Sequence, residues 1–403
     1  MSASSVRARL GGFTLNVAIS SLAGLIAIAL IIRGAGPSAW AAVAVGQAVG
    51  GIAALLVSLG WGVAGPARVA SLPPSERPSC FAQALGTRIV VLALVLPLSL
   101  VVGCAAVPDH RWTAGLVAAA SSTFGLNASW YFTGVGTPMT LLRCETVPRA
   151  TTSLAGAVGV LLGGSVLLVP LATIVGSCAA TAAGWTSVAR TGPVVLPSLR
   201  SNLTGIKDGL TSLSVTSSIT VYSALPLVFA AVLAPDGLAP FALLDRFKNF
   251  ALTAMGPAVQ VAQGYTAGGT RHGLVRRTER TFVLGVVIGV VAAAAFPVAV
   301  VVGSQVMSHG TIEVPLSLTL MFSVVVGIGV VSSMIGMACL PARGEIGGVS
   351  RSTATGAFVF LSLVLPLGAR HDATGVALAA VLAEVCVVIL LIRYFLRGRV
   401  VNA

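Results

Sequence analysis

Long apolar runs are the feature that most constrains the fold of this chain. Two examples are NVAISSLAGLIAIALII at residues 16–32 and RIVVLALVLPLSLVVGCAAV at residues 88–107. A run of ~20 apolar residues is long enough to cross the ~30 Å hydrocarbon core of a bilayer as an α-helix. The strands of a membrane barrel would instead alternate apolar and polar residues, and these runs do not. The sequence therefore predicts an all-α polytopic membrane protein.

The composition excludes a soluble protein and most kinds of enzyme. Charged residues make up 9% of the chain, against about 25% in an average soluble domain. The connections between the apolar runs are too short to fold as domains, and the sequence has no GxxxxGK[ST] loop for nucleotide phosphates. The six cysteines show no CxxC pairing, so no metal site is expected. We expect no catalytic residue, no cofactor and no nucleic-acid partner.

About twelve spans follow when the apolar runs are divided with a window of ~19 residues. Their expected limits are residues 13–33, 39–63, 81–107, 112–135, 141–169, 171–190, 209–233, 239–262, 281–303, 316–340, 352–368 and 374–396. A polar connection after the sixth span divides the chain into halves, residues 1–200 and 201–403. A short motif recurs at the same point of each half, GPARVA at 65–70 and GPAVQVA at 256–262. Because each half has an even number of spans, we expect two parallel six-helix lobes around a central cavity.

The distribution of basic residues predicts the orientation, because cytoplasmic connections are enriched in Lys and Arg. Most of the 24 Lys and Arg residues, Arg88 included, are assigned to the side that holds both termini. The other side holds only Arg33, Arg111 and Arg370. Arg246 and Lys248 are placed inside a span. We therefore expect a multi-pass protein of the cell (inner or plasma) membrane, with both termini in the cytoplasm.

Glycine pairs four residues apart predict close helix packing, because they let two backbones approach each other. The pairs are Gly46 and Gly50, Gly159 and Gly163, and Gly285 and Gly289. Some pairs of this spacing are expected by chance in a chain with 46 glycines, so each pair is a separate hypothesis.

Three stretches resemble the polysaccharide flippase family of the multidrug/oligosaccharidyl-lipid/polysaccharide exporter superfamily. The first is residues 126–154, where Trp130, Tyr131, Phe132 and Gly134 are similar to an aromatic turn that the family has between two spans. The second is GWGVAGPARVAS at 60–71, and the third is DGLAPFALLDRFKNFALTAMGPAVQVAQGY at 236–265, similar to the family's eighth span. Thr133 stands where the family has Gln, and the basic loops contain Arg rather than Lys. The resemblance therefore indicates the superfamily more firmly than the substrate.

The resemblance implies a transporter with an alternating-access mechanism. Its substrate would be an undecaprenyl-diphosphate-linked oligosaccharide, moved from the cytoplasmic to the outer leaflet during polysaccharide (O-antigen or exopolysaccharide) biosynthesis. Such a substrate needs a polar cavity with cations for its diphosphate. The implied partners are this lipid-linked glycan, membrane lipids, and the polysaccharide polymerase and glycosyltransferases of the same pathway.

The eighth span holds the main candidates for contact with the substrate. Asp245, Lys248 and Asn249 lie three or four residues apart and share one helical face, whereas Arg246 is turned by about 100°. Charges inside a bilayer are costly and usually face the protein interior. We expect this segment to line the cavity, with Arg246 and Lys248 attracting the diphosphate. Asp245 would hold Lys248 in place or compete for a coupling cation. Alternatively, the charges extend into the outer membrane interface as anchors.

Other polar residues are weaker candidates. Asn16 and Gln47 would line the same cavity or form hydrogen bonds between helices. Glu384 would titrate in coupling or pair with a neighbouring helix. The basic residues expected around the inner mouth are Arg68, Arg143, Arg149, Arg276, Arg277 and Arg280. Most of these would set the topology, and one or two would meet incoming phosphate.

Three alternative functions stay open on the sequence alone. A cation-coupled multidrug exporter of the same superfamily would favour acidic over basic residues in the cavity. A flippase for the peptidoglycan lipid precursor carries the same diphosphate but commonly has more spans. A membrane-bound polymerase or ligase would need a large outer loop with Arg or His, and the longest outer segment expected here, residues 304–315, is too short for one.

Overall fold

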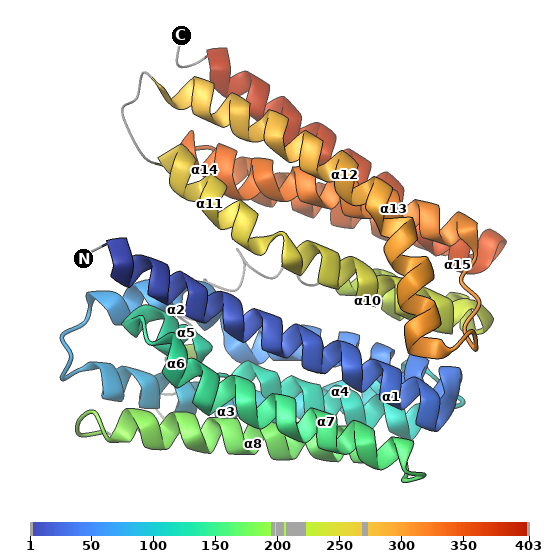
Figure 1. Ribbon diagram of the computed structural model, residues 1–403, viewed down its shortest axis with the longest axis horizontal. Helices are drawn as coiled ribbons and strands as arrows, with labels where there is room; N and C mark the ends of the chain where they lie inside the picture. Colours follow the sequence, from blue (N-terminus) through green and yellow to red (C-terminus); the bar gives the residue numbers. More distant parts are fainter. Residues whose placement is uncertain (1–2, 195–197, 199–204, 207–222, 268–272, 401–403) are drawn as a thin grey trace. The chain divides into compact units, whose positions relative to one another are not determined.

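The computed structural model describes residues 3–194, 198, 205–206, 223–267 and 273–400. The chain divides into two units, Met1–Ala224 (unit 1) and Leu225–Ala403 (unit 2), whose helices are labelled in Figure 1. Every regular element among the described residues is helical, which confirms the all-α prediction. The boundary expected between the two halves, at residues 200 and 201, lies outside the described residues.

Unit 1 is organised around its first helix, α1, which packs against α3, α4 and α7. Its helices are α1 (Ala3–Ser58), α2 (Trp61–Ser71), α3 (Arg77–Ala106), α4 (Arg111–Ser122), α5 (Ser129–Val135), α6 (Pro138–Leu141), α7 (Val147–Leu161) and α8 (Leu168–Ala189). A 3₁₀ turn, η1 (Thr123–Leu126), follows α4, and a π-helical turn, η2 (Leu142–Thr146), precedes α7. α1 is two helices joined at Gly36, whose φ of 86° suits glycine, and Pro37 begins the second helix.

Unit 2 is built mainly from three long helices, with α13 packed against both α12 and α15. Its elements are η3 (Pro235–Gly237), α10 (Leu238–Ala254), α11 (Gly256–Ala267), α12 (Leu274–Ser308), α13 (Leu316–Ser333), the π-helical turn η5 (Met334–Cys339), α14 (Leu340–Ala342) and α15 (Ile346–Val400). An apolar helix at Ser223–Leu233 precedes them. α15 is also two helices, joined at Asp372, which has a φ of 51°.

The number of helical segments agrees with the twelve expected spans, but the fifth span ends earlier than residue 169, because α7 stops at Leu161. Six helical stretches among the described residues are long and apolar enough to cross a membrane. Two of them, Gly11–Ser71 and Gly347–Arg397, are 61 and 51 residues long and contain the kinks at Gly36 and Asp372, so each supplies two spans. The fourth, fifth and eighth spans are broken into shorter helices. Of the expected seventh span, residues 209–222 lie outside the described residues.

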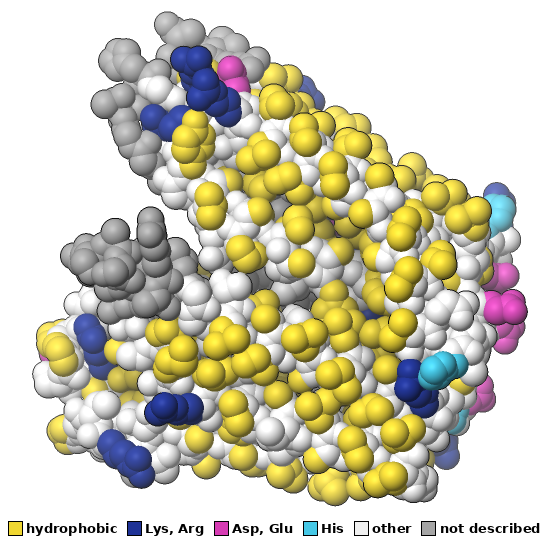
Figure 2. Space-filling view, viewed as in Figure 1, with side chains coloured by type: hydrophobic (Ala, Val, Ile, Leu, Met, Phe, Trp, Pro, Cys, Tyr) yellow, Lys and Arg dark blue, Asp and Glu magenta, His cyan; other side chains and the backbone are white. Residues whose placement is uncertain are grey.

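Both units expose large apolar side chains, as expected for surfaces in contact with lipid. Leu94, Val101 and Phe358 are 70%, 63% and 71% exposed. Figure 2 shows hydrophobic side chains gathered along the middle of the helices. A water-soluble protein rarely leaves so continuous an apolar surface uncovered. The surface therefore supports the membrane location that the composition predicts.

Proline accounts for the two π-helical turns. Pro148 follows η2 and Pro341 follows η5, and a proline has no N–H to donate to the carbonyl four residues earlier. In unit 2 that carbonyl belongs to Met337, and the side chain of Gln263 donates to it at 3.2 Å. Thr266 donates to the next carbonyl, that of Ala338, at 2.8 Å. The wide turn thus presents backbone acceptors that attach it to α11.

The aromatic stretch singled out in the sequence forms part of the buried core of unit 1. Trp130, Tyr131 and Phe132 are all buried. The ring of Trp130 lies 4.7 Å from the ring of Trp61 on α2 and 5.9 Å from that of Phe81 on α3, measured between centroids. Such contacts stabilise beyond the area they bury. The stretch therefore joins α5 to α2 and α3.

Two of the three glycine pairs pack helices closely, as predicted. A methyl group at Gly46 would lie 2.5 Å from the carbonyl oxygen of Ala114 on α4, and Gly50 meets α4 just as closely. Methyl groups at Gly285 and Gly289 on α12 would come similarly close to η5 and α13. The third pair is different, because Gly163 has a φ of 90° and open space around it. Gly163 ends α7 rather than packing it, so the packing prediction is wrong there.

Candidate functional site

The predicted polar face of α10 is held together by one carboxylate. α10 begins at Leu238 after the turn η3, and Asp245 lies ~10 Å further along the helix axis. The ammonium of Lys248 is 2.6 Å from Asp245 Oδ1. The side-chain amide of Asn249 donates to Asp245 Oδ2 at 2.9 Å. The shared face is confirmed, with Asp245 at its centre.

The burial of this face decides between two interpretations of Lys248. Asp245 is 5% exposed and Lys248 6% exposed, inside unit 2. The expectation that Lys248 could extend to the membrane interface as an anchor is therefore wrong, because its ammonium ends on Asp245. Removing two charges from water is offset only when they are paired this closely. An anion that binds Lys248 must therefore compete with Asp245.

Arg246 is placed differently from its neighbours. It lies one residue after Asp245, about 100° around α10, and is half-buried. The two residues before Asp245, Leu243 and Leu244, are fully buried. One side of α10 therefore carries the Asp245–Lys248 ion pair, which has no net charge. Another side carries the Arg246 guanidinium.

Asn16 forms hydrogen bonds between helices, one of the two roles expected of it. Its amide donates to the carbonyl oxygens of Gly12, at 2.8 Å, and Pro138, at 3.1 Å. Its oxygen accepts from the Thr146 hydroxyl at 2.6 Å. These contacts connect α1 to α6 and η2, so most of the hydrogen-bonding capacity of this buried amide is used inside unit 1. Gln47, further along α1, is half-buried.

Arg88, which the distribution of basic residues assigns to the side of the termini, is not an exposed loop charge. It lies inside α3 and is 0% exposed. Its Nη1 donates to the carbonyl oxygens of Gly125, at 3.1 Å, and Asn127, at 2.8 Å. Its guanidinium also lies over the ring of Trp130, at 5.5 Å from the centroid. Arg88 thereby satisfies the backbone where the fourth span is broken, between η1 and α5, as a bilayer requires.

Glu145 binds the backbone at the same break. It is 5% exposed and lies in the π-helical turn η2. Its Oε1 accepts from the backbone N–H of Ala128 at 2.5 Å, and its Oε2 is 2.9 Å from Nε of Arg149. The guanidinium of Arg149 lies over the ring of Phe124, at 4.9 Å from the centroid. Unit 1 thus contains a cluster at the break of the fourth span, made of the buried Arg88 and Glu145 and the half-buried Arg149.

A local signal for this cluster was present in the sequence. Arg88 stands within an apolar run, where a charge faces the protein interior by default. Glu145 precedes Pro148 by three residues, and π-helical turns often occur at functional sites. Two other basic candidates, Arg68 and Arg143, are exposed. The guanidinium of Arg68 lies over the ring of Trp61. Glu384 is half-buried on α15.

No protein-family model and no curated protein matches this sequence. Solved structures do match over almost the whole chain. One is described as the inward-facing conformation of a multidrug resistance MATE family transporter of the MOP superfamily. It has a TM-score of 0.71 and 15% identity, covering 95% of this chain and 94% of that one.

Two further structures share the fold. An outward-facing MATE family transporter of the MOP superfamily gives a TM-score of 0.56 at 12% identity, covering 98% of this chain and 95% of that one. The lipid II flippase MurJ, in an inward closed conformation, gives 0.53 at 12% identity, covering 97% and 90%. Identities this low establish fold and not substrate. The chain therefore has the two-lobed helical fold found in MATE transporters and in MurJ.

Proposed function

We propose that this protein is a membrane transporter that moves a diphosphate-linked, lipid-anchored oligosaccharide between leaflets by alternating access. The fold supports transport, since the structures that share it are described as multidrug transporters and a lipid II flippase. The observation that carries the choice of substrate is the polar segment of α10. It places two cations, Arg246 and Lys248, beside a single carboxylate within an apolar unit.

The chemistry of the proposed substrate matches the basic residues of α10. A diphosphate is a strong acceptor of charge-assisted hydrogen bonds, and the planar guanidinium of Arg246 suits it best. Lys248 would also bind the diphosphate when it exchanges its bond to Asp245 for a bond to phosphate. After that exchange Lys248 stays paired, and Asp245 keeps the hydrogen bond from the Asn249 amide, which lowers the cost of leaving the carboxylate without its base.

The test is surface glycan production in a cell that depends on this protein. Loss of the gene should leave lipid-linked oligosaccharide on the cytoplasmic leaflet. Arg246→Gln and Lys248→Gln should each lower surface glycan at equal protein level. A charge-assisted contact contributes ~1.5–3 kcal/mol, which corresponds to about a tenfold to hundredfold loss of binding. Arg393→Gln, an exposed change of the same charge on α15, is the matched control. Normal surface glycan from the Arg246→Gln, Lys248→Gln double variant would refute the proposal.

A cation-coupled multidrug exporter is the second candidate. Two buried carboxylates, Asp245 and Glu145, are each held by a base, and a carboxylate that exchanges a base for a proton can couple transport to a gradient. Proteoliposomes distinguish the two functions. A drug exporter should expel a cationic dye when a proton or sodium gradient is imposed and lose this activity in Asp245→Asn. A glycan flippase should move a fluorescent diphosphate lipid and not the dye.

We further propose that the protein lies in the cell membrane with both termini in the cytoplasm. The basic ends of its helices support this orientation. The lipid-linked glycan would be its substrate, and the polymerase and glycosyltransferases of the same pathway its functional partners.

A further inference from the structure

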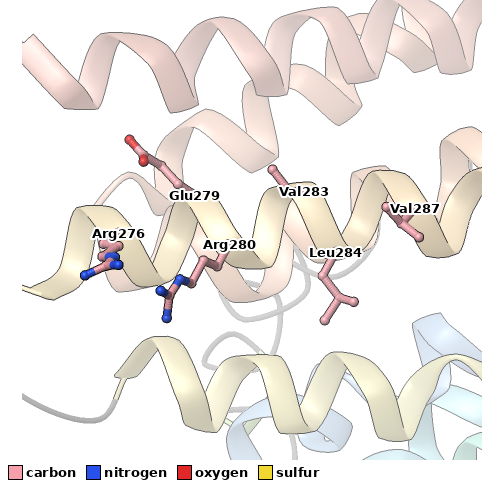
Figure 3. Close-up of a pocket in the computed structure, with 6 residues that line it drawn as sticks. All are labelled: Arg276, Glu279, Arg280, Val283, Leu284 and Val287. Carbon is pink, nitrogen blue, oxygen red and sulfur yellow. The ribbon is translucent and has the colours of Figure 1, made fainter.

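An open groove runs along the first half of α12. Its volume is about 560 Å³, and its lining residues are Arg276, Glu279, Arg280, Val283, Leu284 and Val287. Figure 3 shows Arg280 and Leu284 projecting to one side of α12, while Glu279 and Val283 project to a neighbouring side. All six residues belong to unit 2. Two arginines against one glutamate leave the lining with a net positive charge.

The lining changes from charged to apolar along the helix. Arg276, Arg280 and Leu284 are spaced by four residues and therefore follow one face of α12. Beyond the arginines, Val283, Leu284 and Val287 are 58%, 51% and 54% exposed. The same exposed surface continues through Val290 and Val291, at 64% and 61%. Charge is thus confined to the start of the helix, and the rest of the face is apolar.

The neighbouring polar residues of α12 have a different role. Thr278 is fully buried on the other side of the helix, and its hydroxyl accepts a 3.0 Å bond from Nε of Arg343. Arg343 also donates to the backbone oxygen of Phe395 at 2.6 Å and lies over its ring. This contact attaches α12 to α14 and α15. Arg276 and Arg280 are exposed and face away from that contact.

The apolar face is long enough to line a whole leaflet, because exposed apolar side chains of α12 continue to Val306. From Arg280 to Val290 the helix rises ~15 Å at 1.5 Å per residue. Half of a ~30 Å hydrocarbon core has the same thickness. A small soluble anion would use the arginines and leave the apolar face uncovered. A phospholipid with an anionic headgroup uses both parts of the groove.

We propose that this groove binds an anionic phospholipid from the leaflet that surrounds the beginning of α12. Its phosphate lies between Arg276 and Arg280, and one acyl chain lies along Val283, Leu284 and Val287. The lipid is a bound component of the bilayer rather than cargo, so the site does not depend on the proposed transport function. A volume of about 560 Å³ is ample for a headgroup with the first part of its chains.

The test uses the purified full chain, delipidated in neutral detergent and titrated with dioleoyl-phosphatidylglycerol or dioleoyl-phosphatidylcholine. Bound lipid is counted by native mass spectrometry. The wild type should bind phosphatidylglycerol in preference to phosphatidylcholine. Arg276→Gln and Arg280→Gln should each weaken phosphatidylglycerol about fivefold and the double variant about 25-fold, since each basic residue near anionic lipid contributes ~1 kcal/mol. Arg393→Gln should bind like the wild type.

Two further arms test the lipid assignment itself. Leu284→Ser with Val287→Ser should also weaken phosphatidylglycerol while leaving both arginines in place. Inorganic phosphate at millimolar concentration should not displace the lipid. Displacement by phosphate alone, equal binding of the two lipids, or unchanged binding by the double arginine variant would each overturn the proposal. Thermal melting of each variant checks that these exposed substitutions leave the fold intact.

Discussion

Replacing Arg88 with methionine should destabilise unit 1 more than any exposed arginine substitution. Methionine preserves most of the volume and the apolar stem but cannot donate to the carbonyl oxygens of Gly125 and Asn127. Both oxygens lie at the break of the fourth span, where water is excluded by the bilayer. The Arg88 bond to Ala84 O matters less, because that oxygen belongs to the same helix.

The magnitude follows from the contacts that are lost. Two charge-assisted bonds contribute ~1.5–3 kcal/mol each, and the contact with the Trp130 ring adds ~1–2 kcal/mol. The cost of burying the guanidinium offsets part of this sum. We expect Arg88→Met to lower the free energy of unfolding by about 3–5 kcal/mol, a usual value for breaking a buried ionic network. Arg88→Lys should recover part of the loss, because it keeps the charge without the fork.

The assay is unfolding of the purified protein in mixed micelles by added dodecyl sulfate, followed by tryptophan fluorescence. Arg68→Met is the matched control, because Arg68 also lies over a tryptophan ring but is exposed. It should cost no more than ~1 kcal/mol. Equal losses from the two variants, or a neutral Arg88→Met, would refute the role assigned to Arg88.

Three other predictions concern packing, pairing and orientation. Gly50→Leu should destabilise unit 1 by ~1–3 kcal/mol, because the added side chain overpacks against α4. Gly51→Leu should be tolerated, because the space around Gly51 is open. Equal melting temperatures of the two variants would contradict this prediction. Asp245→Asn should cost about 3–5 kcal/mol in the unfolding titration, because the ammonium it pairs stays buried. In a cysteine-free background, an impermeant thiol reagent should label Thr311→Cys but not Ser75→Cys in intact cells; both positions are exposed, and the reverse pattern would invert the topology.

The sequence alone determined the class of fold and the position of most helices. A bilayer requires every backbone group to be satisfied within the segment, so runs of ~20 apolar residues can only be helices. The kink at Gly36 and the shared face of Asp245, Lys248 and Asn249 are also local, since they depend on residues within one turn of each other. Such features follow from chain neighbours and need no knowledge of the packing.

Only the tertiary structure decided which charges are buried and what holds them. The rule that basic residues mark cytoplasmic loops cannot separate Arg88 from a loop arginine, because its partners Gly125 and Asn127 lie 37 and 39 residues away. The bond between Asn16 and Thr146 spans 130 residues. Contacts of this kind depend on which helices pack together, and helix packing in a membrane is set by close fit over many side chains rather than by a local pattern.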